Sequence, residues 1–421
     1  MIRNIPVAAA AATERAFSQN GVLDPSFLVF ALIYMAADAG RGGYKVLLQG
    51  LWLEAEAWGV SLRSAQAVSA AAFCNARQKL SDALMPQLVQ EVASRCSQAA
   101  GRLGLWKGRR VHAIDGSKVS VGRGRALEEA YGGPTGAHQS QMLVMVLLDV
   151  VLKLPIAFIT GCYRASERTL LLPLLEYLER GVILLLDRGF EGFETFRELE
   201  NRGIDFVVRC RKKNGFRVVE QFVRSGRRQA WVTLAPPHGC EIEGATELKV
   251  RVVRVDLPKQ GVAVLVTTLT EQQASAREIG DLYWRRWRIE TYYAEIKARW
   301  FGGNGFHAET PGGVEQEFGA RVLFTAIMTS LLIAAAAREG IPFDAISRKG
   351  AIVYLHVVLT ALVLLPDSRD LDRAIRSLLS AIGRHRKPFR PGRTYPRRSY
   401  ALQPKWGPLG ANGTHRNGRT R

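Results

Sequence analysis

Two short apolar runs, each followed at once by an aspartate, are the features that most constrain how this chain can fold. Val111–Ile114 leads into Asp115, and Val182–Leu186, the most apolar of the runs, leads into Asp187. Apolar runs of this length, bounded by turn-forming residues, are typical of buried strands. In α/β sheets, functional groups sit at the carboxyl ends of strands, so a carboxylate there is easily explained as a ligand. Aspartate after a strand is also a common turn signal, which makes either residue alone weak support.

The order of the remaining elements predicts an α/β fold with a mixed sheet. Further strands are expected at residues 142–152, 155–161 and 205–210, and helices at 166–180 and 191–203. The pattern then changes to alternation, with strands expected at 216–222, 229–234, 247–257 and 262–269. Strands mixed with helices, followed by strands alone, indicate an α/β domain that carries a β-rich insertion.

Both flanks of this region are expected to be helical. Residues 1–105 show helical spacing of apolar residues, clearest at 61–80 and 85–92, and form either a small DNA-binding domain or a lid. A helix is expected from 274 to 300, with further helices to about 382. Two later apolar runs, 322–337 and 351–365, are shorter than the roughly 20 residues of a membrane span and are predicted to be buried core helices.

The charge balance indicates a polyanionic partner. Lys and Arg number 58 against 38 Asp and Glu, a net charge of +20. Such an excess favours binding to phosphates through counterion release. The tail 383–421 holds eleven Lys or Arg and no acidic residue, and is predicted to be disordered when free. The five cysteines form no CxxC pair, which argues against a zinc ribbon or a disulfide framework and fits a reducing cytosol.

The third feature is a helix face with charges in register. Tyr283, Arg286, Glu290 and Lys297 fall within an arc of roughly 60° at about 100° per residue. A glutamate that faces Asp115 and Asp187 would complete a cluster of three carboxylates, the ligands that Mg²⁺ and Mn²⁺ prefer. Two such ions would activate a water and stabilise the leaving oxygen of a phosphodiester. A solvated helix with an Arg286–Glu290 ion pair would explain the charges but not their register.

These residues carry a resemblance to a known family. The Tyr-x₂-Arg-x₃-Glu-x₆-Lys pattern resembles the YREK signature of bacterial insertion-sequence transposases. Asp115-Gly116-Ser117 is similar to that family's first aspartate motif, and Asp187-Arg188-Gly189-Phe190 to its second. The resemblance covers roughly residues 108–335.

The resemblance implies a fold and a domain order. The expected fold is an RNase H-like α/β catalytic core with a β-rich insertion, plus helical N-terminal and C-terminal regions. The expected divisions are a helical N-terminal domain at 1–105, a core at 106–211 and 271–335, an insertion at 212–270, a helical region at 336–382 and the basic tail at 383–421.

The resemblance also implies an activity. Asp115, Asp187 and Glu290 would form a DDE triad that holds Mg²⁺ or Mn²⁺, with two ions expected. The partner would be double-stranded DNA, both the terminal inverted repeats of the element and its target, bound by a homodimer in the bacterial cytoplasm, at the nucleoid and away from membranes. Cleavage and strand transfer would proceed through hairpin ends.

Several further residues are expected to contact the DNA. Arg286, Lys297 and Arg188 would contact phosphates, and Tyr283 the DNA end near a flipped base. Some family members carry a stacking Trp in the last insertion strand, where this chain has no aromatic residue. Trp231, in an earlier strand, either takes that part or packs inside the insertion. Glu167 and Arg168 resemble a Glu-Arg pair of many relatives, read here as a helix N-terminal charge and a phosphate contact.

Two other functions remain open at this point. A non-catalytic DNA-binding protein derived from a transposase would not need the triad, because carboxylates beside DNA repel phosphate unless metals occupy them. Another RNase H-like nuclease would share the carboxylates but would not need Tyr283, Arg286 and Lys297 in register.

Overall fold

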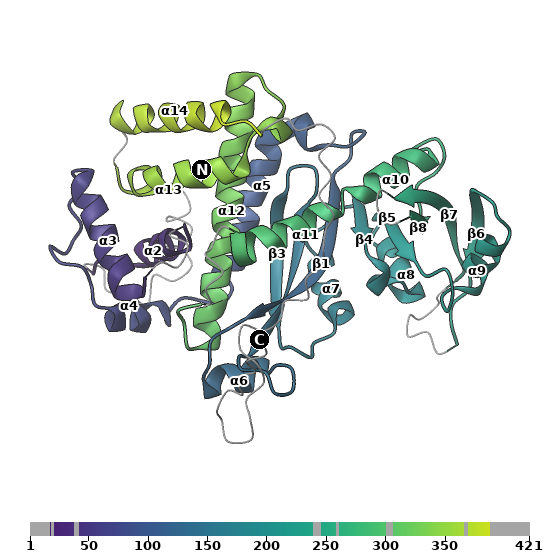
Figure 1. The fold of residues 1–421 in the computed structure, drawn as a ribbon, viewed down its shortest axis with the longest axis horizontal. Helices are drawn as coiled ribbons and strands as arrows, with labels where there is room; N and C mark the ends of the chain where they lie inside the picture. The colour runs from purple at the N-terminus through teal and green to yellow at the C-terminus, as the bar shows by residue number, and fades with distance from the viewer. Residues whose placement is uncertain are drawn as a thin grey trace, which may run out of the picture.

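A single eight-stranded sheet runs from the middle of the molecule to one end (Figure 1). The computed structural model describes residues 17, 21–37, 42–238, 246–257, 261–299, 306–365 and 369–387. The strand order is β3-β2-β1-β4-β5-β8-β7-β6. The strands are β1 (Val111–Ser120), β2 (Gln141–Asp149), β3 (Leu154–Gly161), β4 (Ile183–Leu186), β5 (Asp205–Cys210), β6 (Gln229–Leu234), β7 (Leu248–Leu257) and β8 (Gly261–Thr267).

The direction of the strands defines the fold class. β1, β4 and β5 run parallel to one another, while β2 and β3 add to β1 as an antiparallel pair. This 3-2-1-4-5 order is that of an RNase H-like fold, so the expected fold class is confirmed. The strands after β5 extend the same sheet, because β8 pairs with β5 and then carries β7 and β6.

Helices cover both faces of the sheet. They are α2 (Pro25–Ala37), α3 (Tyr44–Ala57), α4 (Ala70–Arg77), α5 (Leu84–Ala100), α6 (Arg125–Tyr131), α7 (Glu167–Leu175), α8 (Phe193–Asn201), α9 (Arg217–Arg224), α10 (Ala276–Trp284), α11 (Trp287–Ala294), α12 (Pro311–Glu339), α13 (Arg348–Leu364) and α14 (Arg369–Arg384). One face is buried against α7, α8 and α9, and the other against α5, α10, α11 and α12. Alternate residues of β1 therefore enter different cores: Ala113 packs with α5 and α12, and Ile114 with α7 and α8.

The N-terminal helices share the core of the C-terminal ones, at the end of the molecule opposite β6 and α9 (Figure 1). Glu54 of α3 accepts hydrogen bonds from Tyr34 of α2 (2.9 Å) and Thr360 of α13 (2.6 Å). Arg77 of α4 forms a buried ion pair with Glu317 of α12 at 3.3 Å. These buried polar contacts join the N-terminal and C-terminal helices into one packed unit.

The long helix α12 is the buried axis of this layer. Thr310 caps its first turn by accepting from the Gly313 N–H, Pro311 starts it, and Gly340 ends it in the left-handed conformation at φ 60°. By length and composition it would pass for a membrane span, but 83% of its most apolar window is buried inside the protein. The expectation of a core helix at 322–337 is therefore confirmed.

Several sequence-based expectations about local structure were wrong. Residues 216–222 were expected to be a strand, but α9 forms there, because Val219 and Phe222 are buried at helical spacing. In the segment 61–80 only α4 is helical. α13 is not fully buried, since Val353 and Val357 are 57% and 62% exposed.

Most of the basic tail and one of the five cysteines lie outside the residues that the structure describes. The basic tail was expected to begin at 383, but α14 runs to Arg384 and Lys387 still contacts Asp344; residues 388–421 lie outside the described residues. Cys74, Cys96, Cys162 and Cys210 are free thiols, and Cys240 lies outside the described part of the chain.

Candidate active site

The two aspartates lie on neighbouring parallel strands. In the β1–β4 register Ala113 is opposite Leu185, so continuing by two residues brings Asp115 level with Asp187. Neighbouring strands are about 4.8 Å apart, which places both carboxylates in one local cluster. Asp115 was expected at the carboxyl end of its strand. β1 instead continues to Ser120, because β2 pairs with it throughout, and Asp115 lies just past the last residue paired with β4.

Asp187 is held by the turn that follows β4. Its Oδ1 accepts a hydrogen bond from the Gly189 N–H at 2.7 Å, and Phe190 is fully buried beneath the turn. Arg168 donates to the carbonyls of Gly189 (3.0 Å) and Glu191 (2.8 Å) from the neighbouring helix. The sequence-based assignment of Arg168 to phosphate contact misses this bracing of the Asp187 turn.

The segment that carries Glu290 is not one continuous helix, contrary to expectation. α10 ends at Trp284 and α11 begins at Trp287, with tightened turns in which the Arg286 N–H bonds the Tyr283 carbonyl at 3.0 Å. α11 then passes into a π-helical turn, η4 (Glu295–Arg299). Trp300 lies outside the described residues. Changes of helix type of this kind are frequent at functional sites.

Arg286 joins the first aspartate to the glutamate. Its guanidinium is 3.5 Å from Asp115 Oδ2 and 2.7 Å from Glu290 Oε1. It also lies over the Tyr283 ring, 5.8 Å from the ring centroid, and Tyr283 itself is 2% exposed. Asp115 and Glu290 therefore converge on one cation. The Arg286–Glu290 pair that a solvated helix would form is present, but Arg286 is buried, Glu290 is partly exposed, and Asp115 is a third partner.

Tyr293 and Lys297 fix the other end of the segment to β1 and β2. The Tyr293 hydroxyl donates to the Asp115 carbonyl at 2.7 Å and to the Val144 carbonyl at 3.2 Å. The Lys297 ammonium donates to the Ser117 hydroxyl and the Lys118 carbonyl. Burial lowers the pKa of Lys297 to about 8, and Asp115 opposes that shift. Lys297 is thus a cation held beside the strand of Asp115.

The electrostatics of Asp115 reflect a crowd of carboxylates. Its pKa is raised to about 7, first by burial and then by the negative charges of Asp187 and Glu167, against the opposing effect of Arg286. Glu167, at the start of α7, has a raised pKa as well, through burial and Asp187. Like charges gathered in a partly dry site destabilise one another unless a cation lies among them.

Glu167 was not foreseen as part of this cluster. Gly116 makes room for it, since a Cβ at position 116 would lie 2.4 Å from Glu167 Oε1. The signal in the sequence is the glycine after Asp115. A glycine at a close approach of backbone and side chain is the physical reason for that position.

The donor set fits hard divalent cations in its chemistry. Asp115, Asp187 and Glu290 supply carboxylate oxygens from three elements, and oxygen is the ligand that Mg²⁺ and Mn²⁺ select. Within the described residues, no three carboxylates, histidines or cysteines are yet close enough together to hold an ion. The Arg286 guanidinium lies between Asp115 and Glu290 and partly neutralises both carboxylates. A bound metal ion would take over part of that neutralisation.

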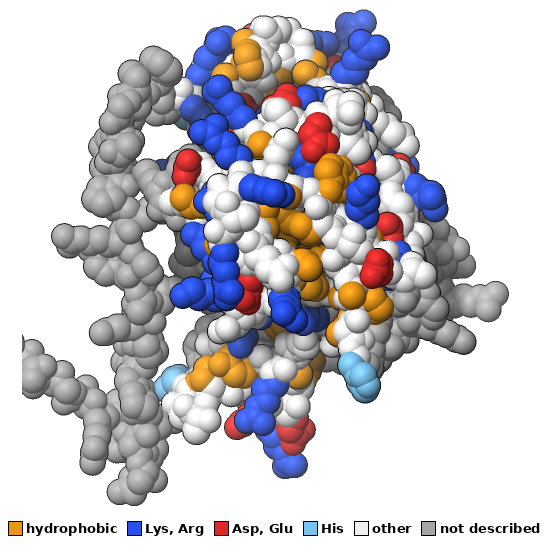
Figure 2. Space-filling model, turned by 90° about the vertical axis from the view of Figure 1, so that its right-hand side faces the viewer, with side chains coloured by type: hydrophobic (Ala, Val, Ile, Leu, Met, Phe, Trp, Pro, Cys, Tyr) orange, Lys and Arg blue, Asp and Glu red, His pale blue; other side chains and the backbone are white. Residues whose placement is uncertain are grey.

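Two further expected DNA contacts are Arg188, next to Asp187, and Trp231, on the edge strand β6. Arg188 is exposed and lines a cavity of about 490 Å³ with Arg209, Arg211, Lys212 and Lys213, at the carboxyl ends of β4 and β5. Lys and Arg side chains are spread over this end of the molecule (Figure 2). Trp231 on β6 is 37% exposed, and its indole N–H donates to Glu271 at 3.1 Å. The indole is thus held at its polar edge and not enclosed in the insertion.

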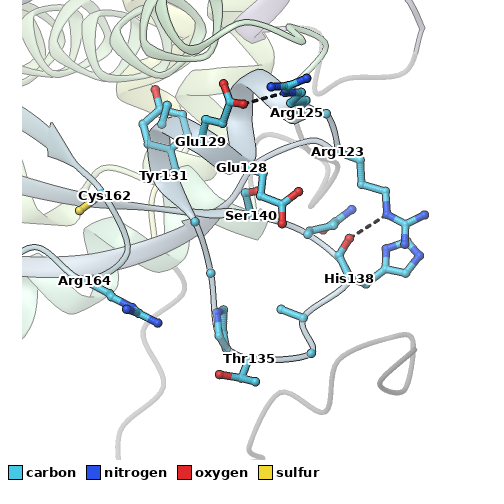
Figure 3. Close-up of a pocket in the computed structure, with 18 residues that line it drawn as sticks. Arg123, Arg125, Glu128, Glu129, Tyr131, Thr135, His138, Ser140, Cys162 and Arg164 are labelled. Carbon is cyan, nitrogen blue, oxygen red and sulfur yellow. Dashed lines mark hydrogen bonds and ion pairs between the residues drawn. The ribbon is translucent and has the colours of Figure 1, made fainter. Parts of the chain in front are cut away.

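A larger cavity lies beyond the far end of β1. It measures about 830 Å³ and is formed by α6 and the glycine-rich loop to β2 (Figure 3). Arg123, Arg164, Glu128 and Glu129 are among the side chains that line it, and Arg125 pairs with Glu129 at 2.7 Å. The mixture of charges gives it no clear ligand, and none of the three triad residues lines it.

Comparison with known proteins gives the family. Residues 106–328 match the transposase DDE domain, and no curated protein matches the sequence. Among solved structures, a piggyBac transposase synaptic complex with hairpin DNA is 14% identical at a TM-score of 0.44, covering 90% of this chain and 82% of that one. Ciona intestinalis Endonuclease V in complex with DNA is 15% identical at a TM-score of 0.21, covering 47% and 89%.

At TM-scores below 0.5 these likenesses do not define the fold, which rests on the strand order. The family match spans the sheet, both aspartates and the segment of Glu290. The chain therefore belongs to the transposase DDE domain family and is a transposase, an enzyme of DNA transposition.

Proposed function

We propose that this transposase cuts and rejoins the DNA ends of its own insertion sequence at a site formed by Asp115, Asp187 and Glu290. The observation that carries the proposal is the convergence of Asp115 and Glu290 on Arg286, with Asp187 close enough to raise the pKa of Asp115. When bound, two Mg²⁺ or Mn²⁺ ions would supply an activated water and neutralise charge on the phosphodiester.

The remaining residues of the site orient the DNA. Lys297, anchored on β1, presents its ammonium beside the triad, and Arg286 has a guanidinium that pairs readily with phosphate. Tyr283 supports Arg286 from beneath. Arg188 and its basic neighbours at the ends of β4 and β5 form a path for the backbone away from the triad.

The exposed indole of Trp231 supports a role for this residue in stacking on a DNA base. Its N–H is held by Glu271, and Lys249 lies 5.6 Å from its ring centroid. A fixed, partly exposed indole beside a cation can stack on an unpaired base, as the hairpin route requires. In the full proposal a homodimer pairs the two terminal inverted repeats and inserts them into target DNA, in a bacterial cytoplasm at the nucleoid.

An excision assay tests the catalytic assignment. The full chain would be mixed with a plasmid that carries its gene and native flanking DNA, in Mg²⁺, Mn²⁺ or EDTA. We expect metal-dependent release of the element by the wild type, and a loss of about a thousandfold or more in Glu290→Gln, which keeps the side chain's shape but not its charge.

Asp281→Asn is the matched control. Asp281 lies on α10 of the same segment, its side chain is 77% exposed, and it lies 4.0 Å from Arg277. It should cleave like the wild type. Retained cleavage in Glu290→Gln would contradict the triad, and binding to the ends without cutting in either metal would indicate a non-catalytic derivative.

A further inference from the structure

A second charged cavity lies on the side of the α11–η4 segment that faces away from the triad. Its volume is about 480 Å³. Its walls come from the turn between β2 and β3, from α11 and η4, from α12, and from the start of α13. Cavities of this size hold a small molecule or a few groups of a larger one. We call it the basic cavity.

Cations outnumber carboxylates in its lining. Five basic residues line it, namely Lys153, Arg288, Arg348, Lys349 and Lys387. Only Glu295 and Asp344 are acidic. These cations come from four separate segments of the chain, with Arg348 and Lys349 adjacent at the start of α13, so the fold produces most of the excess.

Both acidic residues already contact two cations each. Glu295 pairs with Lys153 and lies 3.4 Å from Arg348. Asp344 pairs with Arg288 at 2.8 Å, and its backbone carbonyl accepts from Lys387 at 2.7 Å. Two negative charges thus face five positive ones, and the remaining positive charge has no counterpart among the described lining residues.

The cations are crowded and partly dry. Lys153 and Arg348 are 9% and 8% exposed. Burial lowers the pKa of Lys153 to about 8, and the positive charge of Arg348 adds to the shift. Lys387 is an exposed residue, but its ammonium lies against the Asp344 carbonyl; the pKa of Lys387 is lowered by partial burial of that group and by Arg288 and Arg348. A bound anion would relieve this repulsion, which is the electrostatic condition for an anion site.

The backbone also supports a binding function. Lys153 adopts φ 55°, in the left-handed region that costs a side-chain-bearing residue about 1 kcal/mol. The Asp149 carboxylate holds the turn that leads to it, accepting from the Val151 and Leu152 N–H groups at 2.8 and 2.9 Å. The first turn of the 17-residue helix α13 lines the same cavity, so its helix dipole adds positive potential.

We propose that the basic cavity binds a phosphate-bearing anion. Phosphate groups accept several charge-assisted hydrogen bonds at once, which suits Lys and Arg that converge from several elements. The same chemistry has two sources, a free anion such as pyrophosphate and the phosphodiester backbone of DNA. The proposal does not rest on the triad, because none of the three triad residues lines this cavity.

Binding to the full chain tests the site. Pyrophosphate and, separately, a duplex of arbitrary sequence would be titrated at constant ionic strength into the wild type and into Lys349→Ala/Lys387→Ala. Both lysines are exposed, so the double variant should fold. Lys45→Ala, an exposed lysine on α3, is the matched control. Glu290→Gln as background keeps DNA intact and separates this test from that of the triad.

The two arms distinguish the sources. Saturable pyrophosphate binding that the double variant weakens about tenfold, while Lys45→Ala does not, supports a free-anion site. Absence of pyrophosphate binding together with weaker duplex binding and a smaller salt dependence in the double variant alone supports the DNA backbone as occupant. The proposal is overturned if the double variant binds both ligands as Lys45→Ala does.

Discussion

The two faces of the α11–η4 segment hold charges of opposite balance. Towards β1, Glu290 shares Arg286 with Asp115. The negative charges of Asp187 and Glu167, after burial, raise the pKa of Asp115. Towards α13, Glu295 stands among an excess of cations. Five residues at about 100° each separate the two glutamates, which places them on different sides of the helix. One helical segment therefore divides a site suited to cations from one suited to anions.

Exposure distinguishes the two glutamates further. The Glu290 side chain is 35% exposed and accepts a hydrogen bond from Arg286, whereas the Glu295 side chain is 12% exposed between Lys153 and Arg348. A half-open carboxylate can exchange a partner for a ligand at low cost. An enclosed one is fixed, because breaking a buried pair leaves uncompensated charge. The sequence pattern alone does not separate them, since both are glutamates on an amphipathic segment.

The largest expected effect on the free energy of unfolding is at Glu295, on the face of the α11–η4 segment that lines the basic cavity. Glu295→Gln should lower the free energy of unfolding by about 3 kcal/mol, because Lys153 and Arg348 lose their shared counter-charge. Denaturant unfolding would measure this, and pyrophosphate should restore part of the loss. Glu290→Gln, the control on the open face, should change stability by less than about 1 kcal/mol. Equal losses in the two variants would remove the distinction between the faces.

A smaller effect is expected from the cation on the open face. Arg286→Met should cost about 2 kcal/mol, less than Glu295→Gln, because Glu290 is partly solvated. Mn²⁺ should raise the Tm of Arg286→Met more than that of the wild type, since in the wild type the guanidinium already neutralises Asp115 and Glu290. Arg277→Met, at a 92% exposed side chain, is the control. Identical Mn²⁺ shifts in all three proteins would show that no cation takes the place of Arg286.

The sequence predicted the sheet better than it predicted the helices. Apolar runs that end in Asp115 and Asp187 identify β1 and β4, because a buried parallel strand must be apolar on both faces. The segment 216–222 failed because over so few residues its valines and phenylalanines fit a period of two as well as 3.6. The break at Arg286 could not be read from the sequence, since a continuous helix satisfies the same apolar pattern.

The candidate site was predictable only where its residues belong to a local sequence pattern. Asp115 and Asp187 follow apolar runs, and Glu290 shares a helix face with other charged residues, so local pattern identifies them as candidates. Their catalytic role stays a prediction. Glu167 approaches Asp115 only because β1 lacks a Cβ at Gly116, a contact that no periodicity encodes. The basic cavity could not be predicted from the sequence. Its cations come from four segments between positions 153 and 387, and only the fold brings these segments together.

The smallest expected effect on stability is at Gly116, on the β1 side of the α11–η4 segment where Glu290 lies. Gly116→Ala should leave stability within about 1 kcal/mol, because the atom that its Cβ meets is the end of the flexible Glu167 side chain, which can swing away. If Glu167 helps to hold a cation among Asp115 and Asp187, Mn²⁺ affinity measured by calorimetry should fall about tenfold. Glu167→Gln should cause the same loss, and the double variant no more than either single one, since both changes remove one carboxylate from the cluster. Additive losses would mean that Gly116 acts through the β1 backbone and that Glu167 belongs to α7 alone.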